Sequence, residues 1–231
     1  MNDPGLRSYH LVAIDLPGHG LSGHSETPEL TYTIDGFTRI VAEIIIQLSL
    51  SKCVIIGHSL GGHIAIETLP LLKNQIKGIL ISGAPPLIDA TSFQYAALPN
   101  PAIAAAFTPE VIEDTLEDFF NASFYDRNSI PPSLKIDFKQ TDPMVREFLG
   151  KSIQEGKINN EIGILQMSNI PVCIVTGEQD GFINPEYLKN AEINKWKNKV
   201  FTIPDAAHYP QIENPDVFNS TIVEFAADCF A

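Results

Sequence analysis

The chain has 231 residues, 44% hydrophobic and 19% charged, which predicts a globular protein with a substantial core. Its formal net charge of −13 argues against nucleic acid and anionic membranes as partners, because both bind basic surfaces, and it disfavours strongly anionic substrates. The sequence shows no signal-peptide pattern, no apolar run long enough to span a bilayer and no metal-ligand spacing among its three cysteines, so we expect a cytoplasmic protein without a metal.

The first part of the chain alternates strand and helix patterns. Residues 9–14 predict a short strand, which ends in a loop rich in proline and glycine. Apolar residues recur at helical spacing over residues 34–50 and again over residues 60–69. The β-branched run at residues 54–56 and the apolar run at residues 76–82 predict two buried strands.

The pattern changes between about residues 87 and 168. Prolines divide this stretch into short pieces, some with helical periodicity, and aromatic side chains are dense in it. We interpret it as a helical lid inserted between two strands, although each aromatic alone is typical of ordinary helix–helix packing. The strand and helix patterns then resume, with strands at 171–177 and 200–203 and helices at 185–196 and 215–230.

This alternation predicts an α/β fold with a mostly parallel sheet covered on both faces. We divide the chain into residues 1–86, an N-terminal part of the core, residues 87–168, a helical cap, and residues 169–231, a C-terminal part of the core.

Gly57, Ser59 and Gly61 fit the G-x-S-x-G nucleophile elbow, in which a serine occupies a strained turn between a strand and a helix. We expect both glycines to be required because a Cβ at either position would collide with a neighbouring element. The backbone N–H of Leu60 would then point at the oxygen that becomes negative during acyl transfer.

Ser59, Asp180 and His208 occur in the order nucleophile, acid and base, each a few residues after a predicted strand. The carboxyl ends of parallel strands meet at one edge of the sheet, so these residues can converge there. A serine needs a base to become a nucleophile at neutral pH, and a carboxylate would hold the imidazole in the correct tautomer. The predicted chemistry is nucleophilic acyl transfer.

Other residues compete for these roles. Glu178 or Asp205 could replace Asp180, although Asp205 is only three residues from His208. His58 and His63 lie near the serine, but we expect the His58 ring to point away from it and the His63 ring to lie along the helix.

Several motifs together resemble the α/β-hydrolase superfamily, and they span most of the chain: Asp15-Leu16-Pro17-Gly18-His19-Gly20, Gly57-His58-Ser59-Leu60-Gly61-Gly62, Gly177-Glu178-Gln179-Asp180 and His208-Tyr209-Pro210. Shorter motifs are similar to N-acyl homoserine lactonases of this fold: Gly61-Gly62-His63-Ile64-Ala65-Ile66-Glu67, Gly83-Ala84-Pro85-Pro86 and Lys139-Gln140-Thr141-Asp142. The resemblance implies a cofactor-independent hydrolase of small-molecule esters or lactones, with an apolar channel for the acyl chain under the lid.

The sequence departs from that family at its start. The family normally has two or three further strands and a His-Gly loop that supplies a second oxyanion N–H, and neither is present here, which suggests an N-terminally shortened hydrolase. One missing strand would lie between residues 9–14 and the elbow strand. We expect a gap there, direct pairing of the two strands, or self-association through the exposed sheet edge.

The leading hypothesis is therefore a serine hydrolase that cleaves an ester or a lactone, possibly an N-acyl homoserine lactone. A general carboxylesterase of the same fold is the alternative. A third possibility is a homologue that keeps the elbow but is catalytically impaired. Such a protein would either bind a ligand under the lid or be a truncated product without function.

Overall fold

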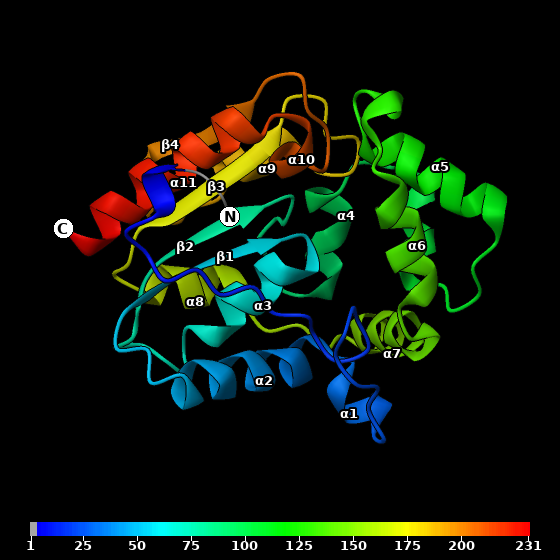
Figure 1. Ribbon diagram of the computed structural model, residues 1–231, viewed down its shortest axis with the longest axis horizontal. Coiled ribbons are helices and arrows are strands. Elements are labelled where there is room, and N and C mark those ends of the chain that lie inside the picture. Colours follow the sequence, from blue (N-terminus) through cyan, green and yellow to red (C-terminus); the bar gives the residue numbers. More distant parts are fainter. Residues whose placement is uncertain (1–3) are drawn as a thin grey trace.

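The computed structural model describes residues 4–231, and its centre is a four-stranded parallel sheet (Figure 1). The strands follow the chain in the order β1 (Cys53–His58), β2 (Ile76–Ser82), β3 (Val172–Gly177) and β4 (Lys195–Ile203). Every neighbouring pair is parallel. The α/β fold class with a parallel sheet is confirmed.

Helices cover both faces of the sheet, as the near-continuous apolar strands require. On one face, α2 (Ile34–Gln47) packs on α3 (Leu60–Thr68), and α3 contacts β1 and β2. On the other face, α11 (Pro215–Phe230) contacts β2 and β4. Short elements complete the core: η1 (Pro4–Leu6), α1 (Pro28–Thr31), α9 (Pro185–Asn190) and α10 (Pro210–Glu213).

Between β2 and β3 the chain forms helices and no strand, apart from an isolated β-bridge between Ala97 and Ile183. Figure 1 shows α5, α6 and α7 together at one end of the molecule, beyond the ends of the strands. Whether residues 87–168 form a separate unit stays a prediction. The helices of this insertion are η2 (Ala90–Ser92), α4 (Phe93–Ala96), η3 (Pro101–Phe107), α5 (Glu113–Ser123), η4 (Arg127–Ser129), α6 (Pro132–Gln140), α7 (Pro143–Gln154) and α8 (Glu161–Met167).

The strand predicted at residues 9–14 is wrong, because this segment has no strand structure and pairs with no neighbour in the sheet. An apolar run becomes a strand only when another strand completes its hydrogen bonds, and no strand of the described chain pairs with this one. Val12 remains 44% exposed. Strand β1 is consequently a sheet edge, where Ile56 is 46% exposed. Self-association through this edge stays a prediction.

The helix predicted at residues 185–196 is too long, since α9 ends at Asn190 and β4 already begins at Lys195. Lys197 and Asn198 interrupt β4 with left-handed backbone, at φ of 53° each, where the pairing register with β3 also shifts. These two polar residues interrupt the apolar pattern, so the sequence does not indicate a strand at the start of β4. Trp196, which the sequence places in a helix, instead stacks on Phe201 at 4.8 Å between ring centroids.

A buried hydrogen bond joins the N-terminal part of the core to the helical insertion. The Tyr32 hydroxyl donates to Asp142 Oδ2 at 2.8 Å, and Asp142 Oδ1 accepts the Met144 N–H at 3.0 Å, so that Asp142 also caps α7. Tyr32 is fully buried and Asp142 is 7% exposed. A buried carboxylate that loses one of its donors is costly, because water cannot replace the donor.

We therefore expect Tyr32→Phe to lower the free energy of unfolding by about 1–3 kcal/mol, measured by urea denaturation. Tyr95→Phe is the matched control because the Tyr95 side chain is 64% exposed. Equal stability of the two variants would contradict a stabilising role for the Tyr32–Asp142 bond.

Candidate active site

Ser59 lies in the turn between β1 and α3 with a strained backbone, at φ 49° and ψ −119°. A non-glycine residue rarely adopts a positive φ, and such strain is typical of a nucleophile elbow. Its side chain makes no capping hydrogen bond to α3, which leaves the hydroxyl available for chemistry. Ser59 itself is partly buried and lines a cavity of about 630 Å³.

Only one of the two glycine predictions agrees with the structure. A Cβ on Gly57 would collide with the Gly61 carbonyl, so glycine is required there. The prediction for Gly61 is wrong, because a Cβ at that position would meet nothing within 4 Å. The close approach occurs one residue later, where a Cβ on Gly62 would collide with Ala84 after β2. Close packing of the helix against that loop therefore depends on Gly62.

Leu60 is the first residue of α3, and the N–H groups in the first turn of a helix have no partner within it. They also lie at the positive end of the helix dipole. The neighbouring Gly62 N–H donates to the Ser59 carbonyl at 2.8 Å and so closes the turn. The Leu60 N–H thus lies at the start of the helix, directly after the serine in the chain.

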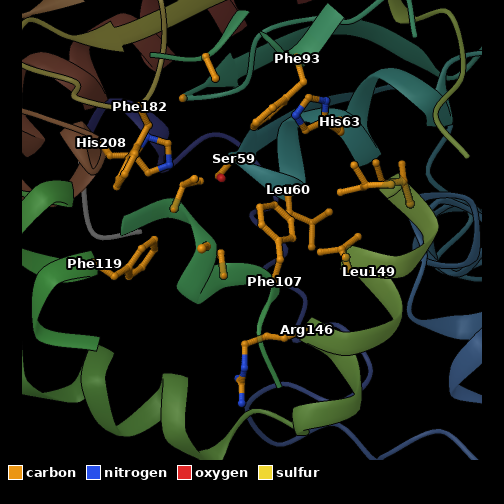
Figure 2. A pocket seen from close by; sticks show the side chains of 18 of the residues that line it. Ser59, Leu60, His63, Phe93, Phe107, Phe119, Arg146, Leu149, Phe182 and His208 are labelled. Atoms are coloured by element: carbon orange, nitrogen blue, oxygen red, sulfur yellow. The ribbon is translucent and has the colours of Figure 1, made fainter. Parts of the chain in front are cut away.

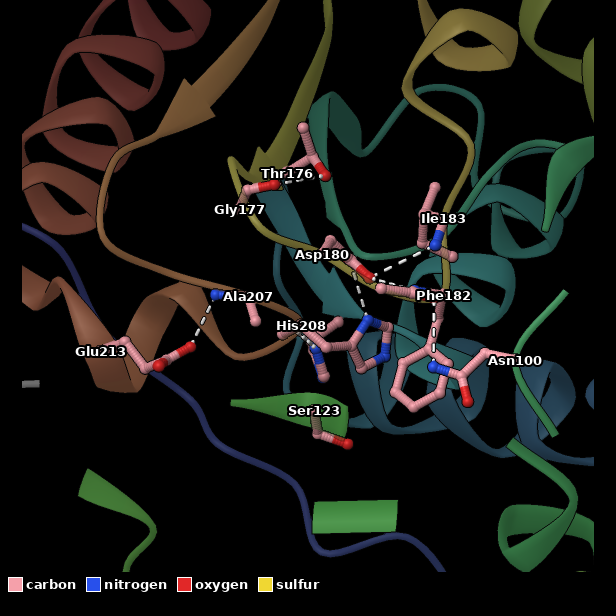
Figure 3. A network of polar contacts seen from close by, with 12 residues as sticks. Asn100, Ser123, Thr176, Gly177, Asp180, Phe182, Ile183, Ala207, His208 and Glu213 are labelled. Atoms are coloured by element: carbon pink, nitrogen blue, oxygen red, sulfur yellow. Dashed lines mark hydrogen bonds and ion pairs between the residues drawn. The ribbon is translucent and has the colours of Figure 1, made fainter. Parts of the chain in front are cut away.

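Asp180 and His208 form a buried hydrogen-bonded pair (Figure 3). The His208 Nδ1–H donates to Asp180 Oδ2 at 3.0 Å, and the residues are 3% and 9% exposed, respectively. Asp180 Oδ1 also accepts the backbone N–H groups of Phe182 and Ile183, at 2.9 and 3.3 Å. Burial alone would raise the pKa of Asp180, but the charge of His208 and the hydrogen bonds from His208 and these two N–H groups outweigh burial and lower the pKa from its ordinary value. Asp180 is therefore a carboxylate at neutral pH.

The backbone of His208 is held at both of its polar groups. Its N–H donates to the Ser123 carbonyl of α5 at 2.9 Å, and its carbonyl accepts from His58 Nε2 at 2.7 Å. Burial and the neighbouring His208 lower the pKa of His58 to about 3, so His58 is a neutral donor. Its ring also packs on Tyr209, 4.8 Å away. His58 therefore anchors the His208 loop and is not free to act as a base.

The other competing residues lie in different environments. Glu178 is exposed and bonds to the side chain of Gln179 at 3.2 Å. Asp205 is exposed and has left-handed backbone, with φ of 53°. The His63 ring bonds to Glu161 rather than to a carboxylate near the serine, at 2.8 Å. Of the acids considered, Asp180 is the one in contact with the His208 ring.

The cavity beside Ser59 has a volume of about 630 Å³ and a mostly apolar wall (Figure 2). In Figure 2 the His208 ring lies beside Ser59, and Leu60 lies next to it at the start of α3. Apolar side chains of the helical insertion form much of the rest of the wall: Phe93, Ile103, Phe107, Phe119, Phe138, Val145, Leu149, Ile153 and Ile158. The cavity can thus hold an apolar chain whose polar end reaches Ser59.

Sequence reasoning missed three residues of this site. Phe182 meets the His208 ring edge to face, with centroids 5.2 Å apart. Arg146 lines the cavity and donates to the carbonyls of Thr108 and Pro109, holding η3 against α7. Glu161 is fully buried. For Phe182, its position two residues after Asp180 was a signal that the sequence offered. Arg146 and Glu161 have no such signal, because they are ordinary residues in helical patterns.

Within residues 4–231, no group of His, Cys, Asp and Glu side chains is arranged to hold a metal ion. The same residues contain no helix with the length and apolar character that crossing a membrane requires.

Comparison with known proteins agrees with this fold. The model of the Alpha/beta hydrolase family matches residues 3–221, and the chain therefore belongs to that family. Similar proteins include the pimeloyl-[acyl-carrier protein] methyl ester esterase of Nitrosospira multiformis, 26% identical over 94% of this chain and 84% of its own length. A putative esterase/lipase of Mycoplasma pneumoniae is also 26% identical, over 95% of this chain and 82% of its own length.

Among solved structures, the N-acyl homoserine lactonase AidH in complex with N-hexanoyl homoserine lactone superposes with a TM-score of 0.86. The sequences are 26% identical, and the match covers 93% of this chain and 78% of the lactonase. The resemblance to lactonases that the short motifs indicate is confirmed. With the esterase and lipase relatives, it identifies the chain as a hydrolase that acts on ester bonds.

Proposed function

We propose that the protein cleaves an ester or a lactone by nucleophilic catalysis at Ser59. His208 takes the Ser59 proton as the hydroxyl oxygen attacks the substrate carbonyl, and the Leu60 N–H stabilises the oxyanion that forms. His208 then gives the proton to the departing alkoxide oxygen, which leaves an acyl-enzyme. Water attacks this ester with His208 again as the base, and release of the acid restores Ser59.

The observation that carries this proposal is the buried bond between Asp180 and His208 beside a cavity that Ser59 also lines. The 3.0 Å contact occupies Nδ1 of His208, so Nε2 is the ring nitrogen left to accept a proton from serine. The ionised Asp180 stabilises the imidazolium that forms. Strain at Ser59, with φ of 49°, supports the nucleophile assignment because it persists only where the surroundings impose it.

We further propose a substrate with an apolar acyl part, and among such substrates an N-acyl homoserine lactone. The apolar wall of the cavity is the evidence for an apolar acyl part in the substrate. The similarity to a lactonase that binds N-hexanoyl homoserine lactone supports the lactone. The esterase relatives favour the second candidate, a general carboxylesterase that acts on acyclic esters.

A substrate panel separates the two candidates. We expect N-acyl homoserine lactones to be opened with release of one proton each, followed with a pH indicator, and kcat/KM to rise with acyl length as more of the chain is buried. If p-nitrophenyl esters are turned over and these lactones are not opened at any acyl length, the protein is a general carboxylesterase. Absence of turnover on both series, with calorimetric binding that Ser59→Ala leaves unchanged, would instead indicate a ligand-binding protein.

A further inference from the structure

A second buried acid–imidazole pair lies in the wall of the same cavity. His63 Nδ1 lies 2.8 and 3.0 Å from the two carboxylate oxygens of Glu161. The Glu161 side chain is fully buried, and its Oε2 also accepts the Leu87 N–H at 2.8 Å. Figure 2 shows His63 beside Phe93, on the α3 side of the cavity. None of the steps proposed for Ser59 uses this pair.

The charges of the pair determine which N–H of the His63 ring can donate a hydrogen bond to a ligand. Burial alone would lower the pKa of His63, but the charge and hydrogen bond of Glu161, with a contribution from Glu67, outweigh burial and raise the pKa from its ordinary value. A fully buried carboxylate also needs a charged partner. In the protonated ring, Nδ1–H is occupied by Glu161, and Nε2–H remains as a donor.

The position of His63 determines which part of a substrate it can meet. His63 lies in the first turn of α3, four residues after Ser59, which is the N-cap residue of that helix. Both line the cavity, whose wall is otherwise mostly apolar. A donor at this position reaches a group a few bonds from the carbonyl that Ser59 attacks, not the far end of an acyl chain.

The nearby charges also select the kind of acceptor. Glu161 already neutralises His63, and Glu67, 5% exposed one turn further along α3, adds negative charge. An anionic group on the substrate would gain little attraction and would meet two carboxylates. A neutral carbonyl oxygen accepts the same hydrogen bond without that repulsion.

We propose that His63 is a specificity residue that donates its Nε2–H to a neutral amide carbonyl on the carbon next to the scissile carbonyl. The preferred substrates are then α-acylamino esters or lactones rather than esters with a plain alkyl chain. This inference rests on the proposed function, because it places the scissile carbonyl at Ser59. Glu161 acts through His63, as a positioning residue that orients the ring and favours its protonated form.

Binding of uncleaved lactones tests the inference separately from catalysis. The background is Ser59→Ala, and the ligands are N-hexanoyl homoserine lactone and α-heptyl-γ-butyrolactone, in which an alkyl chain of the same length replaces the hexanoylamino group. The measured quantity is the ratio of the two dissociation constants, from calorimetry. Adding His63→Phe together with Glu161→Gln removes the donor without leaving a buried carboxylate uncompensated. We expect this pair of changes to lower the preference for the amide ligand about 10- to 100-fold.

Glu161→Gln alone is the matched control, since it keeps the imidazole ring and an acceptor for the Leu87 N–H. We expect a smaller loss of preference in the same direction. An unchanged ratio in variants that melt cooperatively would overturn the inference and leave His63 with a purely structural role. Failure of Ser59→Ala to bind the amide ligand would overturn it too. Failure of the proposed function would appear elsewhere, as an absence of Ser59-dependent turnover in the unmodified protein.

Discussion

Replacing Ser59 with alanine is expected to lower kcat/KM for ester or lactone hydrolysis by at least about a thousandfold, or about 4 kcal/mol of transition-state stabilisation. The variant retains the cavity and the oxyanion donor but has no atom that can form the acyl-enzyme. Its fold should persist because the Ser59 side chain makes no capping bond to α3. Initial rates on a lactone and on a p-nitrophenyl ester, with a thermal melt of each protein, measure both effects.

Ser49→Ala is the matched control for this experiment. Ser49 also has left-handed backbone, with φ of 54°, but it is exposed in the turn after α2 and does not line the cavity. We expect its activity to equal that of the unmodified protein within about twofold, as for a surface substitution. If Ser59→Ala kept a tenth or more of the activity, another group would have to be the nucleophile.

Replacing Asp180 with asparagine is expected to lower kcat by about 10⁴-fold, the loss seen when the acid of a serine–histidine–aspartate site becomes an amide. The asparagine amide donates to Nδ1 of His208 and so forces the proton onto Nε2, where it prevents the ring from accepting the Ser59 proton. The amide oxygen can still accept the Phe182 and Ile183 N–H groups, which preserves the loop. Steady-state kinetics at saturating substrate measure the effect on kcat.

Glu178→Gln tests the rival acid two residues earlier in the same loop. Glu178 is exposed and its side chain accepts a hydrogen bond from the side chain of Gln179, so we expect kcat to change by less than about twofold. A large loss in Glu178→Gln together with a small loss in Asp180→Asn would move the acid role to Glu178.

The sequence narrows the candidates for catalytic residues because chain order constrains them, and their catalytic roles stay predictions. Ser59, Asp180 and His208 follow β1, β3 and β4, respectively, and parallel strands bring their carboxyl ends together. The same reasoning fails at residues 9–14, where the apolar pattern is present but a neighbouring strand is not. It also fails at the start of β4, where Lys197 and Asn198 conceal the strand.

Residues whose role depends on a distant partner are the ones that the sequence does not reveal. His58 adjoins the serine in the chain, yet its hydrogen bond goes to the carbonyl of His208, far along the sequence. Glu161 is one of many acidic residues until the fold buries it against His63 and Leu87. Pairwise contacts between separate elements carry no local pattern, and only the folded structure identifies them.

The central claim is that Ser59 is an activated nucleophile, and covalent labelling tests it most directly. We expect a fluorophosphonate probe to add once to the folded protein, at a rate that Asp180→Asn strongly reduces, and peptide mass spectrometry to locate the adduct on Ser59. Boiled protein and Ser59→Ala should remain unlabelled, since the first has no active site and the second no nucleophile. A folded, monodisperse protein that gains no adduct at Ser59, or gains one at another residue, would contradict the claim.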